Sequence, residues 1–350
     1  MVSRRLLLQF LIAFFGLSLT GSLAAQPSQP THVVATFSIL GDMVKRIGGK
    51  HVALTTLVGP NGDTHVYQPT PAAARAVSEA KVLIVNGLEF EGWLDRLIDA
   101  TDFKGMHVIA TKGIEPIAFE EREKHGGHNE KADDGKRSHG ENDHGHDKKG
   151  TEENHRDGHS DDKHDDHHAG HDHGAFDPHA WQSLKNAVIY VDNITGALAK
   201  ADPANAATFY KNRAAYVAEI KALDVVIREN MARLSANRRT IVTSHDAFQY
   251  FGRDYGLTFL APQGLSTDSE ASAQDVARLI VQMRKESISA VFVENITDSR
   301  LLEQIAKETG ASIGGTLYPG ALSGPTGPAP TYLDMMRHNY GTLVDALGIS

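Results

Sequence analysis

Residues 203–234 read PANAATFYKNRAAYVAEIKALDVVIRENMARL, with no glycine and no proline after the first position. Asp202 is placed to cap a helix here, with Pro203 at its first helical position. A single helix of roughly 30 residues would be about 45 Å long. The stretch therefore predicts a stiff strut between the two halves of the chain. Its apolar residues recur near helical spacing, at Phe209, Tyr216, Ile220, Leu223, Ile227 and Leu234.

Short apolar runs alternate with helical stretches on both sides of this helix. The alternation predicts right-handed βαβ units and an α/β class. About 325 residues after removal of an export signal exceed what one core supports, so we expect two parallel-sheet lobes. The expected strands are residues 32–37, 52–58, 82–85 and 107–110, then 240–243, 257–261, 290–293 and 312–317, with helices at 40–47, 71–80, 273–284 and 300–309.

The first residues are typical of an export signal. Arg4 and Arg5 precede an apolar run at 6–19, and small residues follow at 22–25. The run is short for a membrane span of about 20 residues, which favours a cleaved signal at 1–25 over an anchor. We therefore expect a soluble periplasmic protein. The chain has no cysteine, so it is expected to have neither disulfides nor a lipid attached to an N-terminal cysteine.

We divide the remaining chain into an N-terminal lobe at 32–200, a linking helix at 201–236 and a C-terminal lobe at 237–350. The N-terminal lobe contains an insert at 125–173 with 14 acidic and 7 basic residues. The rest of the chain is close to neutral, so the basic face that nucleic-acid binding requires is not expected. The insert is too polar to bury a core and is predicted to be disordered without metal.

The insert holds 12 of the 19 histidines. One interpretation is a solvated linker whose composition drifted. Histidines among carboxylates favour metal capture, at weak accessory sites. These residues are His125, His128, His139, His144, His146, His155, His159, His164, His167, His168, His171 and His173.

Three other histidines occupy special positions. His65 follows the turn at 59–64 after an expected strand, His179 lies just after the insert, and His245 ends the strand that begins at Thr240, before a short aromatic helix. Ligands of open parallel sheets bind at the carboxyl ends of strands, so we expect His65 and His245 to project into a cleft between the lobes. Imidazole suits Zn²⁺, which takes about four ligands. The remaining histidines, His32, His51, His107 and His338, are interpreted as ordinary surface or core residues.

The segments around these histidines resemble a known family. GPNGDTHVYQP at 59–69, DPHAW at 177–181 and SHDAF at 244–248 are similar to the metal-ligand motifs of the zinc/manganese solute-binding proteins of ABC transporters. Asn86-Gly87-Leu88 with Glu91 and Trp93, and Gly264-Leu265-Ser266 with Glu270, resemble further landmarks of that family. The resemblance covers nearly the whole mature chain. It implies two lobes joined by a backbone helix, with metal in the interlobe cleft.

The acidic, histidine-rich insert resembles that of the zinc-specific, ZnuA-type branch. One departure concerns the fourth ligand, because the position that commonly supplies an Asp in this family is Gly320 here. Water, Asp63 or a histidine of the insert would then complete the shell. A missing carboxylate also argues against manganese, which prefers oxygen ligands.

The resemblance implies a zinc-binding protein that delivers Zn²⁺ to the membrane permease of an ABC transporter. We expect a monomer without enzymatic activity. Two alternatives remain at this point. One is a periplasmic zinc buffer or adhesin in which the insert is the main binding region. The other is a three-histidine zinc hydrolase with Asp63, Asp246 or Glu294 as general base, although no motif assigns that role.

Overall fold

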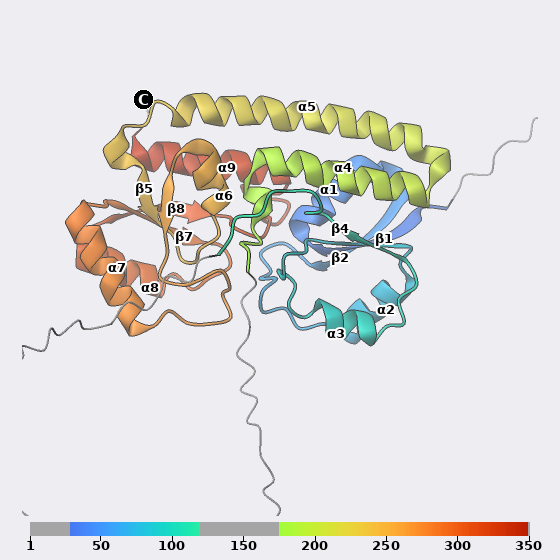
Figure 1. The fold of residues 1–350 in the computed structure, drawn as a ribbon, viewed down its shortest axis with the longest axis horizontal. Coiled ribbons are helices and arrows are strands. Elements are labelled where there is room, and N and C mark those ends of the chain that lie inside the picture. Colours follow the sequence, from blue (N-terminus) through green and yellow to red (C-terminus); the bar gives the residue numbers. More distant parts are fainter. Residues whose placement is uncertain (1–28, 120–174, 349–350) are drawn as a thin grey trace, which may run out of the picture.

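Two parallel four-stranded sheets form the framework of the protein (Figure 1). The computed structural model describes residues 29–119 and 175–348. The sheets have the orders β2-β1-β3-β4 and β6-β5-β7-β8, the same order in both halves. The strands are β1 (Thr31–Phe37), β2 (Val52–Val58), β3 (Val82–Val85), β4 (Met106–Ile109), β5 (Thr240–Val242), β6 (Thr258–Leu260), β7 (Ala290–Glu294) and β8 (Ser312–Leu317). All eight predicted strands are present to within one residue at each end, which confirms the α/β class.

Helices cover both faces of the sheets. In Figure 1, α1 and α4 lie between the first sheet and α5, whereas α2 and α3 lie on the opposite side. The four helices predicted between strands are present, while α4 and α9 were not predicted. The helices are α1 (Ser38–Gly48), α2 (Pro71–Glu79), α3 (Leu94–Asp99), α4 (Leu184–Ala201), α5 (Ala206–Met231), α6 (Gln249–Tyr255), α7 (Ala273–Glu286), α8 (Arg300–Thr309) and α9 (Tyr332–Leu347), with short 3₁₀ turns at Gly49–His51, Ala180–Gln182, Pro203–Asn205 and Ala236–Arg238.

The long helix extends across both sheets (Figure 1). It is α-helical from Ala206, because Pro203–Asn205 forms a 3₁₀ turn, and it ends at Met231. Every apolar residue of the predicted stripe is buried. The predicted cap is wrong: Asp202 makes no capping bond to the backbone, and its carboxylate accepts a hydrogen bond from the side chain of Asn205 instead (2.6 Å).

One hydrophobic core joins the two sheets. It includes Phe37 at the end of β1, Trp181 before α4, Leu317 in β8 and Tyr332 in α9. The Tyr332 hydroxyl donates a hydrogen bond to the carbonyl oxygen of Trp181 (2.6 Å), across residues far apart in sequence. A smaller cluster lies between the second sheet and helices α7 and α8. The two halves are therefore packed against each other rather than connected by α5 alone.

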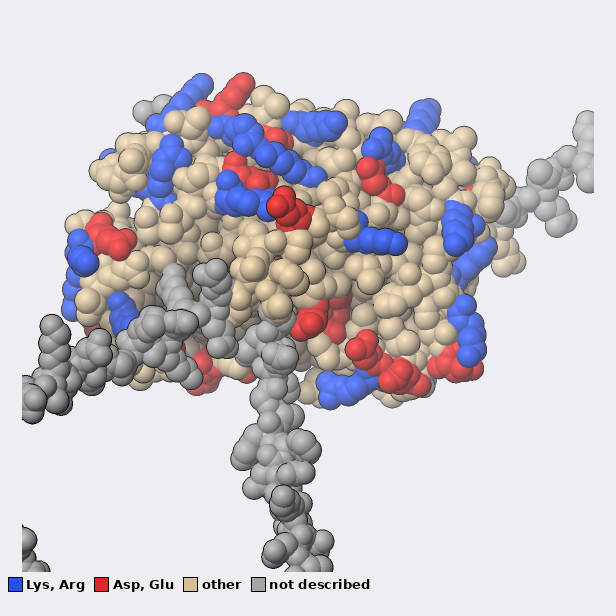
Figure 2. Space-filling view, in the orientation of Figure 1, with Lys and Arg blue, Asp and Glu red and all other residues tan. Residues whose placement is uncertain are grey.

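The outer face of α5 is charged. Figure 2 shows basic and acidic side chains interspersed along this side of the molecule. Arg213 of α5 pairs with Asp192 of α4, and Arg228 pairs with Asp224 within α5. Exposed pairs of this kind contribute little stability. Their alternation gives this solvent-facing side of the helix a mixed charge.

Some predictions fall outside the described residues. These are the export signal at 1–25 and the histidine-rich insert at 125–173. Within residues 29–119 and 175–348, no helix combines the length and the apolar character needed to cross a membrane. The division at 200 and 236 stays a prediction; α4 ends at Ala201, and a 3₁₀ turn begins at Ala236.

Candidate metal centre

Each of the three predicted histidines lies in a loop fixed by the fold. His65 follows β2 in the loop that begins at Gly59, where Asn61 has a left-handed backbone (φ 55°), a conformation that asparagine tolerates. His179 precedes the 3₁₀ turn that leads into α4. His245 lies just after β5 and forms a parallel bridge to Gln263. His65 and His245 thus follow the carboxyl ends of strands, as predicted.

The three side chains converge. Each offers one nitrogen, and the three nitrogens lie within 4.8 Å of one another. The Nε2 atoms of His65 and His179 are 3.3 Å apart. Two nitrogens bound tetrahedrally to zinc at 2.0–2.1 Å would be about 3.3–3.4 Å apart, so this pair already has the spacing of metal ligands. Among the described residues, this group of ligand atoms contains three histidines and no carboxylate.

Two carboxylates orient the buried histidines. Nδ1 of His179 lies 2.8 Å from Asp177 Oδ1, and Nδ1 of His245 lies 2.6 Å from Glu294 Oε2. A carboxylate that accepts from Nδ1–H fixes the proton there and leaves the Nε2 lone pair for a metal. Nε2 of His245 is buried and has no hydrogen-bond partner among the residues that the structure describes. Such an atom is costly unless a ligand occupies the site.

Burial and charge move the pKa values in opposite directions. Burial lowers the pKa of His179 well below its usual value, and the nearby His245 lowers it further. Burial also acts to lower the pKa of His245, but the charge and hydrogen bond of Glu294, together with Asp63 and Asp246, raise it above its usual value. Burial raises the pKa of Asp177 to about 7. His179 is therefore held neutral, which a metal ligand requires, whereas His245 binds a proton more readily.

Asp63, one of the candidates for the fourth ligand, is not in the group of converging ligand atoms. Asp63 Oδ1 accepts a hydrogen bond from the backbone N–H of His65 (3.0 Å), and Oδ2 accepts one from the Thr267 hydroxyl (2.5 Å). Asp63 therefore positions the His65 peptide and connects the two halves of the protein. An insert histidine as fourth ligand lies outside the described residues.

Gly320, the other position discussed for a fourth ligand, lies beside the aromatic wall of the site. A Cβ at this position would be 3.7 Å from Trp181 and 3.9 Å from Phe90, which are ordinary contacts. Gly320 is also absent from the residues with positive φ in the described chain, so its backbone accepts a side chain without strain. Phe90 itself packs against His65 with ring centroids 4.9 Å apart. A Cβ is therefore accommodated at this position.

The four histidines interpreted as ordinary residues do not join the group. His51 packs edge-on against Phe209, His338 Nε2 contacts the carbonyl oxygen of Thr316 (2.9 Å), and His32 is exposed. His107 lies at the far end of the cavity described next, and burial lowers its pKa.

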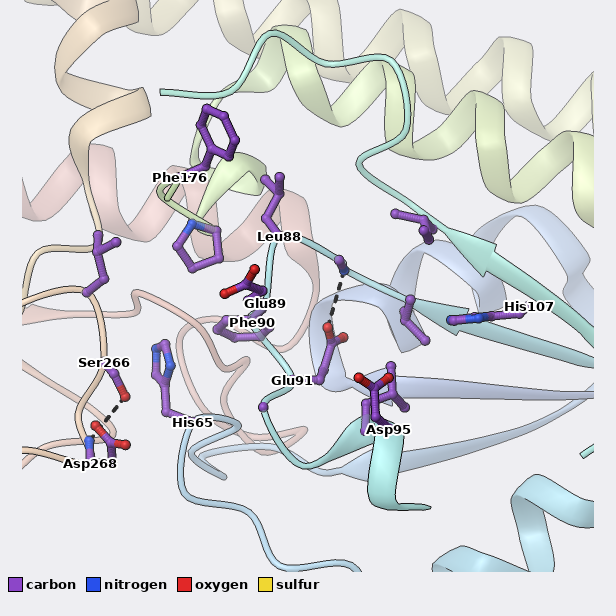
Figure 3. Close-up of a pocket in the computed structure, with 17 residues that line it drawn as sticks. His65, Leu88, Glu89, Phe90, Glu91, Asp95, His107, Phe176, Ser266 and Asp268 are labelled. Atoms are coloured by element: carbon purple, nitrogen blue, oxygen red, sulfur yellow. Dashed lines mark hydrogen bonds between the residues drawn. The ribbon is translucent and has the colours of Figure 1, made fainter. Parts of the chain in front are cut away.

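A cavity of about 480 Å³ opens beside His65 (Figure 3). Glu89 and Phe90 line it from the loop after β3, Phe176 from the segment before His179, and Asp268 from the second half of the chain. His65 is half-buried, whereas His179 and His245 are fully buried. Of the three histidines, His65 is the one that lines this cavity, together with acidic and aromatic side chains.

Sequence reasoning missed the orienting role of Asp177 and Glu294, and it missed Phe90. One signal was present: Asp63 precedes His65 by two residues, as Asp177 precedes His179. In both cases the carboxylate accepts the backbone N–H of its histidine. The repeated Asp-X-His pattern thus indicates a local clamp on the histidine peptide.

Comparisons with known proteins show the family of the chain. The family described as zinc-uptake complex component A, periplasmic (ZnuA), matches residues 33–346. The iron-binding protein YfeA of Yersinia pestis is 30% identical over 97% of this chain and 94% of its own. A Mn-bound S38A mutant of a periplasmic metal-binding protein from Candidatus Liberibacter asiaticus is 31% identical, with TM-score 0.71, covering 91% of this chain and 99% of that one. The periplasmic zinc-binding protein TroA from Treponema pallidum is 26% identical, with TM-score 0.73 and the same coverage.

Proposed function

The chain belongs to the ZnuA family of periplasmic metal-binding proteins, and from this premise we propose that it captures Zn²⁺ and delivers it to the permease of an ABC transporter. Its role as the substrate-binding protein of a metal transporter follows from the family. Its choice of zinc is our proposal, because the similar proteins are named for iron, manganese and zinc. We place the protein in the periplasm, as a monomer.

The observation that carries the proposal is the convergence of three imidazole nitrogens, with no carboxylate of the described residues in the group. Nitrogen ligands suit zinc, whereas manganese favours oxygen ligands. The 3.3 Å spacing of two Nε2 atoms fits a tetrahedral ion. A fourth position, open to water on the His65 side, would complete four-coordination.

The same geometry argues for transport rather than catalysis. A hydrolase requires a base that is available to the metal-bound water. Both oxygens of Asp63 and both of Glu294 already accept hydrogen bonds, and Asp246 accepts one from Gln249 (2.5 Å). The three carboxylates considered for this role are thus engaged in holding the loops of the site.

Equilibrium competition with a chromophoric chelator tests the proposal. We expect tight binding of one Zn²⁺ at the centre, strongly weakened in His65→Ala and unchanged in His107→Ala, a histidine of the same cavity outside the ligand group. Cobalt substitution should give the absorption of a four-coordinate site. Equal affinities of the two variants for zinc, or tighter binding of Mn²⁺ than of Zn²⁺, would overturn the proposal.

A further inference from the structure

The segment from Asn86 to Trp93, between β3 and α3, has an unusual backbone. Gly87, Leu88 and Glu89 all have positive φ (86°, 54° and 60°), and two of these residues carry side chains. Left-handed backbone is costly for residues with a Cβ and persists only where surrounding contacts impose it. Figure 3 shows this turn beside His65, with Phe90 at its end. The surrounding contacts must therefore stabilise this turn.

A buried carboxylate maintains the turn. Glu91 accepts hydrogen bonds from the backbone N–H of Asn86 (2.7 Å) and of Gly87 (3.2 Å), and from the Thr36 hydroxyl of β1 (2.6 Å). The Thr111 hydroxyl donates to the carbonyl oxygen of Asn86 (2.7 Å). Contacts from β1 and from the residues after β4 therefore fix the turn on the first sheet.

The two ends of this segment contact the peptides that carry two of the metal ligands. Nδ2 of Asn86 donates to the carbonyl oxygen of Pro178 (2.9 Å), directly before His179. Nε1 of Trp93 donates to the carbonyl oxygen of Thr64 (2.8 Å), directly before His65. The N–H of each of these two peptides is held in turn by Asp177 or Asp63.

Both histidine peptides are therefore fixed on both sides. A peptide whose C=O and N–H are each bonded cannot rotate without losing two buried hydrogen bonds. The Phe90 ring adds a wall, 4.9 Å from the His65 ring and 5.8 Å from the His179 ring. One short segment thus sets the backbone of two ligands and limits the movement of their rings.

We propose that Asn86 and Trp93 are positioning residues of the metal site, which hold the Pro178–His179 and Thr64–His65 peptides so that the two Nε2 atoms stay at metal-ligand spacing. Glu91 supports them by maintaining the turn. The inference rests on the proposed function, because it assumes that His65 and His179 bind the ion. Pre-organised ligands lose less entropy on binding, so loss of either contact weakens metal affinity.

Trp93→Phe is the mildest test, since it removes the donor and keeps a ring against Tyr67. We expect Zn²⁺ affinity to fall about tenfold, within the range typical of groups that orient metal ligands. Asn86→Ala should have a similar effect. The spectrum of the Co²⁺-loaded protein should change in both variants, because the ligand geometry is altered.

Asn193→Ala is the matched control. Its amide also donates to backbone carbonyl oxygens of the same half, those of Ala110 and Lys112 (2.8 Å each), away from the histidine peptides. It should lower the free energy of unfolding without changing metal affinity or the cobalt spectrum. If Asn86→Ala does not fold, Trp93→Phe decides the question alone.

A double-mutant cycle separates this inference from the proposed function. In a His65→Ala background, Trp93→Phe should cause no further loss of Zn²⁺ affinity, whereas Asn86→Ala still should. If His65→Ala weakens binding and Trp93→Phe leaves affinity and spectrum like wild type, the positioning role is wrong. If His65→Ala itself has no effect, the proposed metal site is wrong.

Discussion

The carboxylates behind His179 and His245 are hydrogen-bonded differently, which predicts losses of metal affinity of different size when each is replaced by its amide. Glu294 uses both oxygens: Oε1 accepts the backbone N–H of Ser244 (3.1 Å) and of His245 (3.2 Å), while Oε2 contacts Nδ1 of His245 (2.6 Å). Asp177 uses Oδ1 for both the N–H (2.9 Å) and Nδ1 (2.8 Å) of His179. Its Oδ2 has no hydrogen-bond partner among the described residues.

A glutamine at position 294 cannot satisfy all the hydrogen bonds that Glu294 makes, whereas an asparagine at position 177 can satisfy those of Asp177. Gln at 294 has one acceptor and one donor group. If its oxygen faces the two backbone N–H groups, its NH₂ faces Nδ1 of His245 and forces the ring proton onto Nε2, where metal must bind. If the side-chain amide is flipped, its NH₂ group faces the two backbone N–H donors instead of an acceptor. Asn at 177 can place its oxygen at Oδ1 and its NH₂ at the unused position.

We predict that Glu294→Gln weakens Zn²⁺ binding about 10–100-fold, or about 1.4–2.8 kcal/mol, whereas Asp177→Asn costs less than about tenfold. Chelator competition at neutral pH measures both affinities. Nitrogen-15 NMR of the metal-free protein reports the ring tautomer of His245 directly, and thermal unfolding shows whether each variant folds. Equal losses in the two variants, or an unchanged tautomer in Glu294→Gln with weakened binding, would refute the reasoning.

Three further predictions concern the ligand shell and its surroundings. Gly320→Asp should tighten Zn²⁺ binding about tenfold and raise the affinity for Mn²⁺ relative to Zn²⁺. Competition with a chelator measures both affinities. Unchanged affinity for both ions would mean that a side chain at this position does not reach the metal. Because the pKa of His245 is raised, zinc must displace its proton, so zinc affinity should fall about tenfold per pH unit below that pKa. His179 has a lowered pKa and therefore adds no further fall near neutrality. Zinc titrations from about pH 8 to 6 test this, and an affinity that does not change with pH would contradict it. Deletion of 125–173 should leave the tight site intact and remove weaker sites, which lose zinc below about pH 6.5. Calorimetry measures the number of zinc ions bound by each protein. Loss of tight binding would show that the insert supplies an essential ligand.

The sequence was sufficient for the sheets and for the three histidines, for a physical reason. Strands buried in parallel sheets form continuous apolar runs, and residues just beyond them meet at one edge. His65 follows β2 of the first sheet and His245 follows β5 of the second sheet, each beyond a run of this kind. The apolar stripe of α5 could also be predicted, because a helix that packs along one side has apolar residues at helical spacing.

The carboxylate that contacts His245 could not be predicted from the sequence, because it depends on which strands are neighbours in the sheet. Glu294 ends β7 and meets His245 only because β5 pairs with β7. That order does not follow from the chain pattern. Asp63 illustrates the opposite error: its closeness to His65 in sequence suggested a ligand, whereas a carboxylate two residues before a histidine is well placed to accept that histidine's own N–H.

Similar proteins are named for iron, manganese and zinc. Here the described ligand group provides three nitrogens. The rings of His179 and His245 are oriented by carboxylates, and the Nε2 atoms of His65 and His179 are 3.3 Å apart. An ion that demands six oxygen-rich contacts would have to move these peptides, and each movement would break the hydrogen bonds of Asn86, Trp93, Asp63 or Asp177. Selectivity would then arise from the rigidity of the loops as much as from the ligands, and Gly320→Asp would relax it by adding an oxygen without loosening the histidines.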